Sequence, residues 1–222
     1  MGSNNDISLK ALAKINLGLD VVRRREDGYH EVRMIMQTIQ LYDRLDIKRT
    51  QEPGIQIQTN LSFLPVNENN LIYKAAKLLM DEFSITDGVS VKLDKRIPVA
   101  AGMAGGSTDA AAMLIGVNRL FSLGLTKRQL MERGVQIGAD VPYCIMRGTA
   151  LAEGIGEALS PLPPMVKCPV LIAKPSISVS TKFVYQNLKL DDTTIHPDID
   201  RLIDDIKAKN LHDIAAHMGN VL

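Results

Sequence analysis

A glycine-rich stretch between Arg96 and Ala112 holds the residues best suited to chemistry in this chain of 222 residues. Its glycines precede three polar residues and an alanine run, in the order Gly102, Gly105, Gly106, Ser107, Thr108 and Asp109. A glycine loop that leads into a helix points free backbone N–H groups at an anion, most often a phosphate. We expect Ser107 to cap this helix and Asp109 to lie in its first turn, where its charge complements the helix dipole.

The common phosphate-binding motifs do not fit this loop. A P-loop needs a lysine before its Ser/Thr, where this chain has Gly106. The dinucleotide fingerprint G-x-G-x-x-G is not supplied by residues 102–106 either. The alternative interpretation is a glycine turn that packs an alanine-rich helix tightly against its neighbour, and the loop alone leaves both interpretations open.

A second group of polar residues lies on a predicted strand near the N-terminus. Apolar residues alternate over residues 6–22, at Ile7, Leu9, Ala11, Ala13, Ile15, Leu17, Leu19 and Val21. This alternation predicts one long strand, or two joined by a bend. Lys14 and Asn16 then project to the same side, about 7 Å apart along the strand. A solvated strand face would also explain them, although asparagine is disfavoured in mid-strand.

Three more candidates follow strand or helix ends. Asp27-Gly28 predicts a hairpin turn, after which Tyr29 and His30 open the next strand. Asp140 lies in Gly138–Pro142, between a helix end and an apolar stretch. For each of these residues a structural role in a turn or strand end is the alternative to a functional one.

The elements that must position these residues are read from periodicity and turn signals. Beyond the first strand, we expect strands over residues 29–41, 43–49, 54–59, 88–95, 147–153 and 168–174. We expect helices over 70–83, 107–121, 181–188 and 198–209, and another that starts at the capping box Thr126–Gln129 and stops at Gly138. The proline-rich run Ser160–Pro164 predicts a linker and a domain boundary.

Composition excludes several classes of protein. A net charge of +1 gives no field that attracts nucleic acid or membrane, and 4% aromatic residues without tryptophan provide no stacking surface for single strands. Neither a signal peptide nor a membrane span is predicted. Cys144 and Cys168 are isolated, so we expect free thiols in a reducing, cytoplasmic setting.

Taken together, the motifs resemble one superfamily of small-molecule kinases. Ala13–Leu17, Asp27–His30, Pro98–Ala112 and Gly138–Pro142 are similar to the galactose, homoserine, mevalonate and phosphomevalonate (GHMP) kinases. The combination of A-K-I-N-L with D-G-Y-H resembles the branch that phosphorylates a cytidine diphosphate-linked methylerythritol in the non-mevalonate isoprenoid pathway. The resemblance implies transfer of the ATP γ-phosphate to the 2-hydroxyl of that alcohol, with Mg²⁺.

The resemblance also implies a fold of the α/β (α+β) class with two domains. Residues 6–162 would form a ribosomal-protein-S5-like domain with the glycine loop, and residues 163–222 would begin a ferredoxin-like domain. The family carries a further glycine-rich loop downstream of the last residues of this chain. We therefore expect the second domain to be incomplete here.

Site residues are assigned by the same resemblance. Asp140 would be the general base, with Lys14 beside it. The substrate would contact Asn16, Tyr29, His30, Thr181 and Tyr185, and Ser107 or Thr108 would help to hold Mg²⁺. ATP would contact Pro98, Val99, Ala100, Ala101, Gly102, Met103, Ala104, Gly105, Gly106, Ser107, Thr108, Asn70, Leu71 and Lys95.

Other functions stay open at this level. A sibling kinase for homoserine or mevalonate, or a fragment that binds ATP without turnover, would share the glycine loop. An S5-like module can also bind nucleic acid, which the near-zero charge disfavours. We expect a small-molecule substrate, no nucleic-acid or membrane partner, and a monomer or homodimer.

Overall fold

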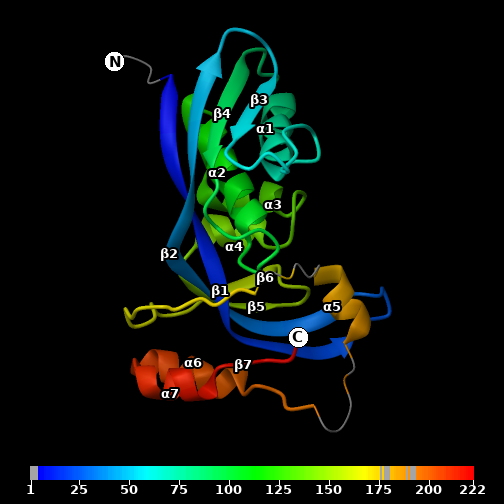
Figure 1. Ribbon diagram of the computed structural model, residues 1–222, viewed down its shortest axis with the longest axis vertical. Helices are drawn as coiled ribbons and strands as arrows, with labels where there is room; N and C mark the ends of the chain where they lie inside the picture. Colours follow the sequence, from blue (N-terminus) through cyan, green and yellow to red (C-terminus); the bar gives the residue numbers. More distant parts are fainter. Residues whose placement is uncertain (1–4, 176, 178–180, 189, 191–193) are drawn as a thin grey trace. The chain divides into compact units, whose positions relative to one another are not determined.

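The computed structural model describes residues 5–175, 177, 181–188, 190 and 194–222, with backbone only at residues 181 and 182. The chain forms two compact units (Figure 1). The first unit comprises residues 1–13, 40–98 and 104–146, and the second comprises residues 14–39, 99–103 and 147–222. Two long neighbouring strands, β1 (Asp6–Arg24) and β2 (His30–Thr50), contribute residues to both units.

The sheet of the first unit is built on the second half of β2. Strand β4 (Gly88–Asp94) runs antiparallel to it, from Arg44 opposite Asp94 to Thr50 opposite Gly88. Strand β3 (Ile55–Thr59) is parallel to β4 at the sheet edge. Alternate residues such as Leu45 and Ile47 are buried, because side chains on a strand alternate between its two faces.

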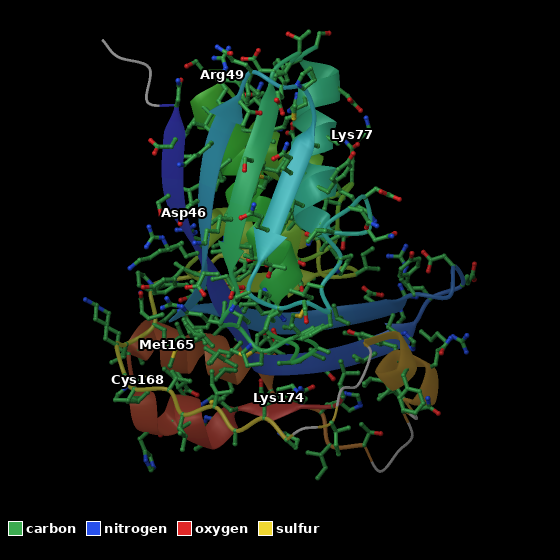
Figure 2. All side chains as sticks on the ribbon, turned by 45° about the horizontal axis from the view of Figure 1, so that its top comes forward. Asp46, Arg49, Lys77, Met165, Cys168 and Lys174 are labelled. Atoms are coloured by element: carbon green, nitrogen blue, oxygen red, sulfur yellow. The ribbon has the colours of Figure 1, made fainter. Side chains whose placement is uncertain are left out.

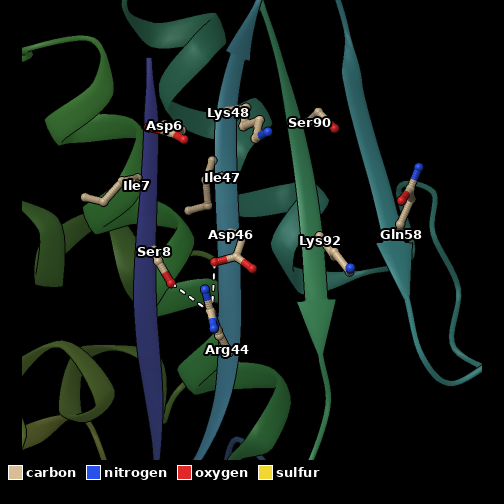
Figure 3. A pocket seen from close by; sticks show the side chains of 10 residues that line it. All are labelled: Asp6, Ile7, Ser8, Arg44, Asp46, Ile47, Lys48, Gln58, Ser90 and Lys92. Carbon is tan, nitrogen blue, oxygen red and sulfur yellow. Dashed lines mark hydrogen bonds and ion pairs between the residues drawn. The ribbon is translucent and has the colours of Figure 1, made fainter. Parts of the chain in front are cut away.

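Helices cover one face of this sheet (Figure 3). They are α1 (Leu71–Glu82), α2 (Gly105–Leu120), α3 (Lys127–Gly134) and α4 (Val141–Met146). Helix α2 packs against α1, α3 and α4. It also lies very close to β2, since a Cβ added at Gly116 would lie 2.3 Å from Ile47 Cδ1. Small residues on α2 therefore let the helix approach the sheet.

The second unit also packs helices on strands. Strand β7 (Gly219–Asn220) pairs in parallel with β1, and β5 (Thr149–Glu153) pairs antiparallel with β2 and with β6 (Ala158–Pro161). The helices are α5 (Thr181–Asn187), α6 (Ile199–Ala208) and α7 (Leu211–His217). The core joins β1 and β2 to α6 and α7 through Leu17, Ile35, Ile199, Leu202, Ile203, Ile206 and Ile214.

The strand predictions are largely confirmed, with two corrections. The alternation over residues 6–22 forms one strand, but residues 29–41 and 43–49 belong to the single strand β2. Residues 168–174 form no strand, and Leu171 there is 97% exposed. Figure 2 labels Met165, Cys168 and Lys174 along this irregular segment. An apolar run makes a strand only where it finds a ladder partner, and this run has none among the described residues.

The helix predictions need more correction. Helix α2 begins at Gly105, two residues earlier than predicted, and α3 ends at Gly134 instead of Gly138. The short helices α4 and α7 were not predicted. Ser160 and Pro161, predicted as linker, belong to β6. The capping box of α3 is confirmed, with Thr126 and Gln129 bonding reciprocally.

Two smaller features complete the description. Cys144 is buried and Cys168 is half-buried, and both are free thiols. Within the described residues, no helix has the length and apolar character needed to cross a membrane.

Candidate active site

The glycine loop has an unusual backbone just before helix α2. Ala100, Gly102 and Ala104 have positive φ angles of 54°, 68° and 55°. Left-handed backbone costs an alanine about 1–3 kcal/mol, and such strain gathers at ligand sites. Left-handed residues in a loop of this kind also gather N–H groups into an anion-binding concavity. The loop therefore has the backbone conformation typical of anion-binding loops, and this conformation has a cost in stability.

The first turn of α2 leaves its backbone donors open. The first helical hydrogen bond runs from the Thr108 amide to the Ala104 carbonyl, at 2.8 Å. No side chain caps the helix, because the N-cap residue is Ala104. The amides of Gly105, Gly106 and Ser107 precede that first bond and have no acceptor within the helix. Gly106 is exposed, whereas Gly105 and Ser107 are half-buried.

Two expectations about this turn were wrong. Ser107 does not cap the helix, because it is the third helical residue and a cap needs extended backbone. Its half-buried hydroxyl makes no hydrogen bond within the described part of the chain. Asp109 lies past the first turn and is buried, so it does not serve the helix dipole.

Leu71 and Asn70 differ in their relation to the loop. A Cβ at Gly106 would lie 3.4 Å from Leu71 Cδ1, so Leu71 lines the start of α2. Asn70 caps α1 instead: its Oδ1 accepts from the Ile72 amide at 2.9 Å, and its Nδ2 donates to the Pro65 carbonyl at 2.7 Å. The side chain of Asn70 is thus already occupied by a structural role.

Lys95 lies in a buried ionic cluster beneath the loop. Its Nζ donates to Asp43 Oδ2 and, at 2.8 Å, to Asp109 Oδ2. All three side chains are at least 92% buried. One ammonium is shared by two carboxyl groups, and burial raises the pKa of Asp109 to about 8 despite the lysine. The Lys95 ammonium is therefore already bound by two buried carboxyl groups of the first unit.

Lys14 and Asn16 lie together in the second unit, as predicted. Lys14 is only 5% exposed, and its Nζ donates to Asn16 Oδ1 at 3.1 Å. The Lys14 amide also donates to the Met103 carbonyl at 3.2 Å, which ties β1 to the glycine loop within this unit. A buried ammonium that has an amide oxygen but no carboxylate partner among the described residues suits a ligand with negative charge.

Asp140 lies in the first unit, in the turn before α4. It is half-buried, and its backbone carbonyl accepts from the Cys144 amide at 3.0 Å, which opens the helix. Its carboxylate has no partner in the described part of the chain. Because Lys14 and Asp140 belong to different units, their pairing stays a prediction.

The residues predicted for the substrate lie partly together in the second unit. The rings of His30 and Tyr185 have centroids 5.1 Å apart at an interplanar angle of 31°. Tyr29 is 60% exposed, and its amide donates to Asp27 Oδ1 in the hairpin turn. Thr181 begins α5, and its side chain lies outside the described part of the structure. His30 and Tyr185, which the family resemblance assigns to the same substrate, thus form an aromatic pair.

A shallow hollow of about 660 Å³ lies on the open face of the sheet in the first unit (Figure 3). Its lining residues are Asp6, Ile7, Ser8, Arg44, Asp46, Ile47, Lys48, Gln58, Ser90 and Lys92. Ser8 and Arg44 bond to Asp46 there and hold the pKa of its carboxyl below the ordinary value. No residue of the glycine loop or of α2 lines this hollow.

Asp43 is the residue at this site that sequence reasoning missed. On β2 the buried positions alternate, and Asp43 occupies the same face as Leu45 and Ile47. Lys95 likewise continues the buried face of Val91 and Leu93. The sequence signal was a charged residue at a strand position that faces the core. Such a residue requires a partner, because an isolated buried charge is costly.

Comparison with known proteins defines the class first. Residues 70–148, which include the glycine loop and Asp140, match the family described as GHMP kinases N terminal domain. The structure superposes on a homoserine kinase from Cytophaga hutchinsonii with a TM-score of 0.72 at 16% identity, over 99% of this chain and 73% of that one. The fold is therefore that of a GHMP small-molecule kinase.

More similar relatives define the family within that class. The chain is 61% identical to the 4-diphosphocytidyl-2-C-methyl-D-erythritol kinase of Lachnoclostridium phytofermentans, over 97% of this chain and 74% of the relative. The kinase of the same name from Lachnospira eligens is also 61% identical, over 97% and 75%. A crystal structure of 4-(cytidine 5'-diphospho)-2C-methyl-D-erythritol kinase superposes with a TM-score of 0.74 at 32% identity, over 91% and 72%. The chain belongs to the 4-diphosphocytidyl-2-C-methyl-D-erythritol kinase family.

Proposed function

We propose that this protein transfers the γ-phosphoryl group of ATP to the 2-hydroxyl of 4-diphosphocytidyl-2-C-methyl-D-erythritol. The observation that carries the proposal is the uncapped start of α2 behind a strained glycine loop, in a chain 61% identical to kinases of that name. Phosphoryl transfer needs positioning and charge stabilisation more than covalent help from the protein. The residues described above supply both.

The nucleotide end of the reaction is assigned to the first turn of α2. The amides of Gly105, Gly106 and Ser107 would bind the phosphates, with Leu71 beside them. Residues 98–104 and Thr108 adjoin these donors in the chain, and we assign them to ATP for that reason. For Asn70 and Lys95 we now expect backbone contacts at most, because their side chains already have partners.

The Mg²⁺ assignment is supported by the hydroxyl of Ser107. This hydroxyl is half-buried at the helix start and has no hydrogen-bond partner among the described residues. Magnesium prefers oxygen ligands and usually keeps several waters beside substrate phosphates. Ser107, with Thr108 next to it, would hold a Mg²⁺ ion that neutralises charge on the transferred phosphoryl group.

The chemical step is assigned to Lys14 and Asp140. The 2-hydroxyl oxygen attacks the γ-phosphorus, the bond from that phosphorus to the bridging oxygen breaks, and ADP leaves. Asp140 accepts the hydroxyl proton, and Lys14 stabilises the charge of the phosphoryl group in transit. The burial of Lys14, with Asn16 as its hydrogen-bond partner, supports this role, because a preorganised cation needs no reorientation during the reaction.

The cytidine end of the substrate is assigned to the aromatic pair of His30 and Tyr185. Rings 5.1 Å apart present flat, polarisable surfaces of the kind on which a nucleobase stacks. Tyr29, which is 60% exposed, and Thr181 are proposed as further contacts.

The assignment of the chemical step is tested by ADP release with Mg²⁺, ATP and the cytidylated alcohol. Asp140→Asn and Lys14→Met should each lower kcat by at least about 100-fold while the Kd for ATP changes little, because general-base and charge-stabilising groups each contribute that much. Glu132→Gln, an exposed carboxylate of α3, is the control and should behave as wild type. Full kcat in Asp140→Asn would remove this residue from the chemistry.

A further inference from the structure

The buried cluster of Asp43, Lys95 and Asp109 contacts both ends of the glycine loop. In the segment before the loop, Asp43 Oδ1 accepts from the amides of Arg96 and Ile97, at 2.5 Å and 2.8 Å. In the helix after the loop, α2, Asp109 accepts from Lys95 at 2.8 Å. Lys95 bonds to both carboxyl groups, so a single ammonium connects the strand end before the loop to the helix after it.

The same ammonium also supports the first residue of α2 directly. A Cβ at Gly105 would lie 2.8 Å from Lys95 Nζ and 3.2 Å from Ile97 Cγ2. The backbone of Gly105 therefore rests on the cluster, and only glycine fits there without displacing the lysine. The Gly105 amide is one of the donors assigned to the phosphates, so its position depends on where Lys95 is held.

Stability alone does not account for such a cluster. Replacing buried ion pairs by apolar residues of similar volume is often neutral or stabilising, since desolvation offsets their attraction. Asp109 Oδ1 is in addition buried with no hydrogen-bond partner among the residues that the structure describes, which is a cost. The adjoining loop is strained at Ala104, and α2 has no side-chain cap. The segments before and after the loop must therefore hold it in place.

We propose that Asp43 and Asp109 are positioning residues for nucleotide binding, which act through Lys95 to hold the first-turn amides of α2 in place. None of the three side chains touches the nucleotide in this account. The inference rests on the proposed function, because it assumes that these amides bind the phosphates of ATP.

The test measures ADP affinity by calorimetry, together with the melting temperature and the KM values of both substrates. Asp43→Asn removes the charge that holds Lys95 and presents it with an amide donor. We expect at least a tenfold rise in the Kd for ADP and in the KM for ATP, and no more than a twofold change in the KM for the alcohol. The control is Asp94→Asn, an exposed neighbour whose carboxylate pairs with Arg96, and it should bind ADP as wild type does.

A second variant covers the case in which Asp43→Asn does not fold. Asp43→Asn with Lys95→Gln replaces the ion pair by a neutral amide pair of similar size, and the same tenfold loss of ADP affinity is expected in a folded protein. A lower melting temperature with unchanged ADP affinity in either variant would overturn the positioning role. A wild-type protein that does not bind ADP would overturn the proposed function, and this inference with it.

Discussion

The pH dependence of stability should report the buried carboxyl of Asp109. Its pKa is raised from 3.8 to about 8 in the folded protein, chiefly by burial. Between these two values the folded state binds a proton that the unfolded state has released. The contribution of this carboxyl is therefore complete below pH 4 and is lost as the pH rises towards 8.

The magnitude follows from the difference of one bound proton. Each pH unit in this window corresponds to 1.36 kcal/mol, so the carboxyl should lower the free energy of unfolding by about 3 kcal/mol between pH 5 and pH 7. Asp109→Asn keeps the shape of the side chain and removes the titration. The stability of this variant should therefore fall less than that of wild type over the same range, by about the same 3 kcal/mol.

Urea unfolding followed by circular dichroism at pH 5, 6 and 7 measures this difference. Asp94→Asn, which removes an exposed carboxylate at the end of β4, should keep the wild-type profile. Parallel profiles for wild type and Asp109→Asn would refute the reasoning, because they would mean that Asp109 is ionised in the folded protein at pH 5.

Three further predictions concern the ligands and the packing. Tyr185→Ala removes one ring of the aromatic pair, so the KM for the cytidylated alcohol should rise about tenfold, as expected for one lost base stack, with the KM for ATP unchanged in steady-state assays. Ser107→Ala should raise the Mg²⁺ concentration for half-maximal activity severalfold, whereas Ser90→Ala on the open sheet face should not; equal Mg²⁺ titrations would exclude the serine as a ligand. Gly116→Val introduces atoms into the space occupied by Ile47 and should lower the free energy of unfolding by about 1–3 kcal/mol in denaturant titrations; unchanged stability would mean that α2 can move away from the sheet.

Local patterns predicted the elements that position the site better than they predicted how the site is held. The alternation over residues 6–22 identified β1, and with it the shared side of Lys14 and Asn16. The capping box at Thr126 identified the start of α3. In these cases the signal is local, because the side chain that specifies the element also makes the contact.

The failures arose where a distant partner decides the outcome. Residues 168–174 are apolar enough for a strand, but a strand also needs a neighbour to pair with. Strand β2 was divided at Tyr42, although its two halves form one strand that pairs first with β5 and then with β4. Helix α2 begins behind a left-handed alanine, for which the sequence carries no signal.

The candidate site shows the same limit. The glycine loop was identified from residue types, but its support by Asp43 depends on a residue more than 50 positions away. Asp109 was assigned to the helix dipole because its neighbours in sequence suggested a helix start, whereas its partners in space are Lys95 and the protein interior. A charge at a core-facing register predicts that a partner exists, but not which residue it is.

The most direct test of the proposed activity compares kcat/KM for three alcohols in an ADP-release assay with Mg²⁺ and ATP, with the phosphorylated product identified by mass spectrometry and ³¹P NMR. We expect 4-diphosphocytidyl-2-C-methyl-D-erythritol to be phosphorylated on its 2-hydroxyl with a kcat/KM at least about 1,000-fold above those for homoserine and mevalonate, because neither of these fills the cytidine contacts. A kcat/KM for homoserine or mevalonate equal to or above that of the cytidylated alcohol would contradict the proposal.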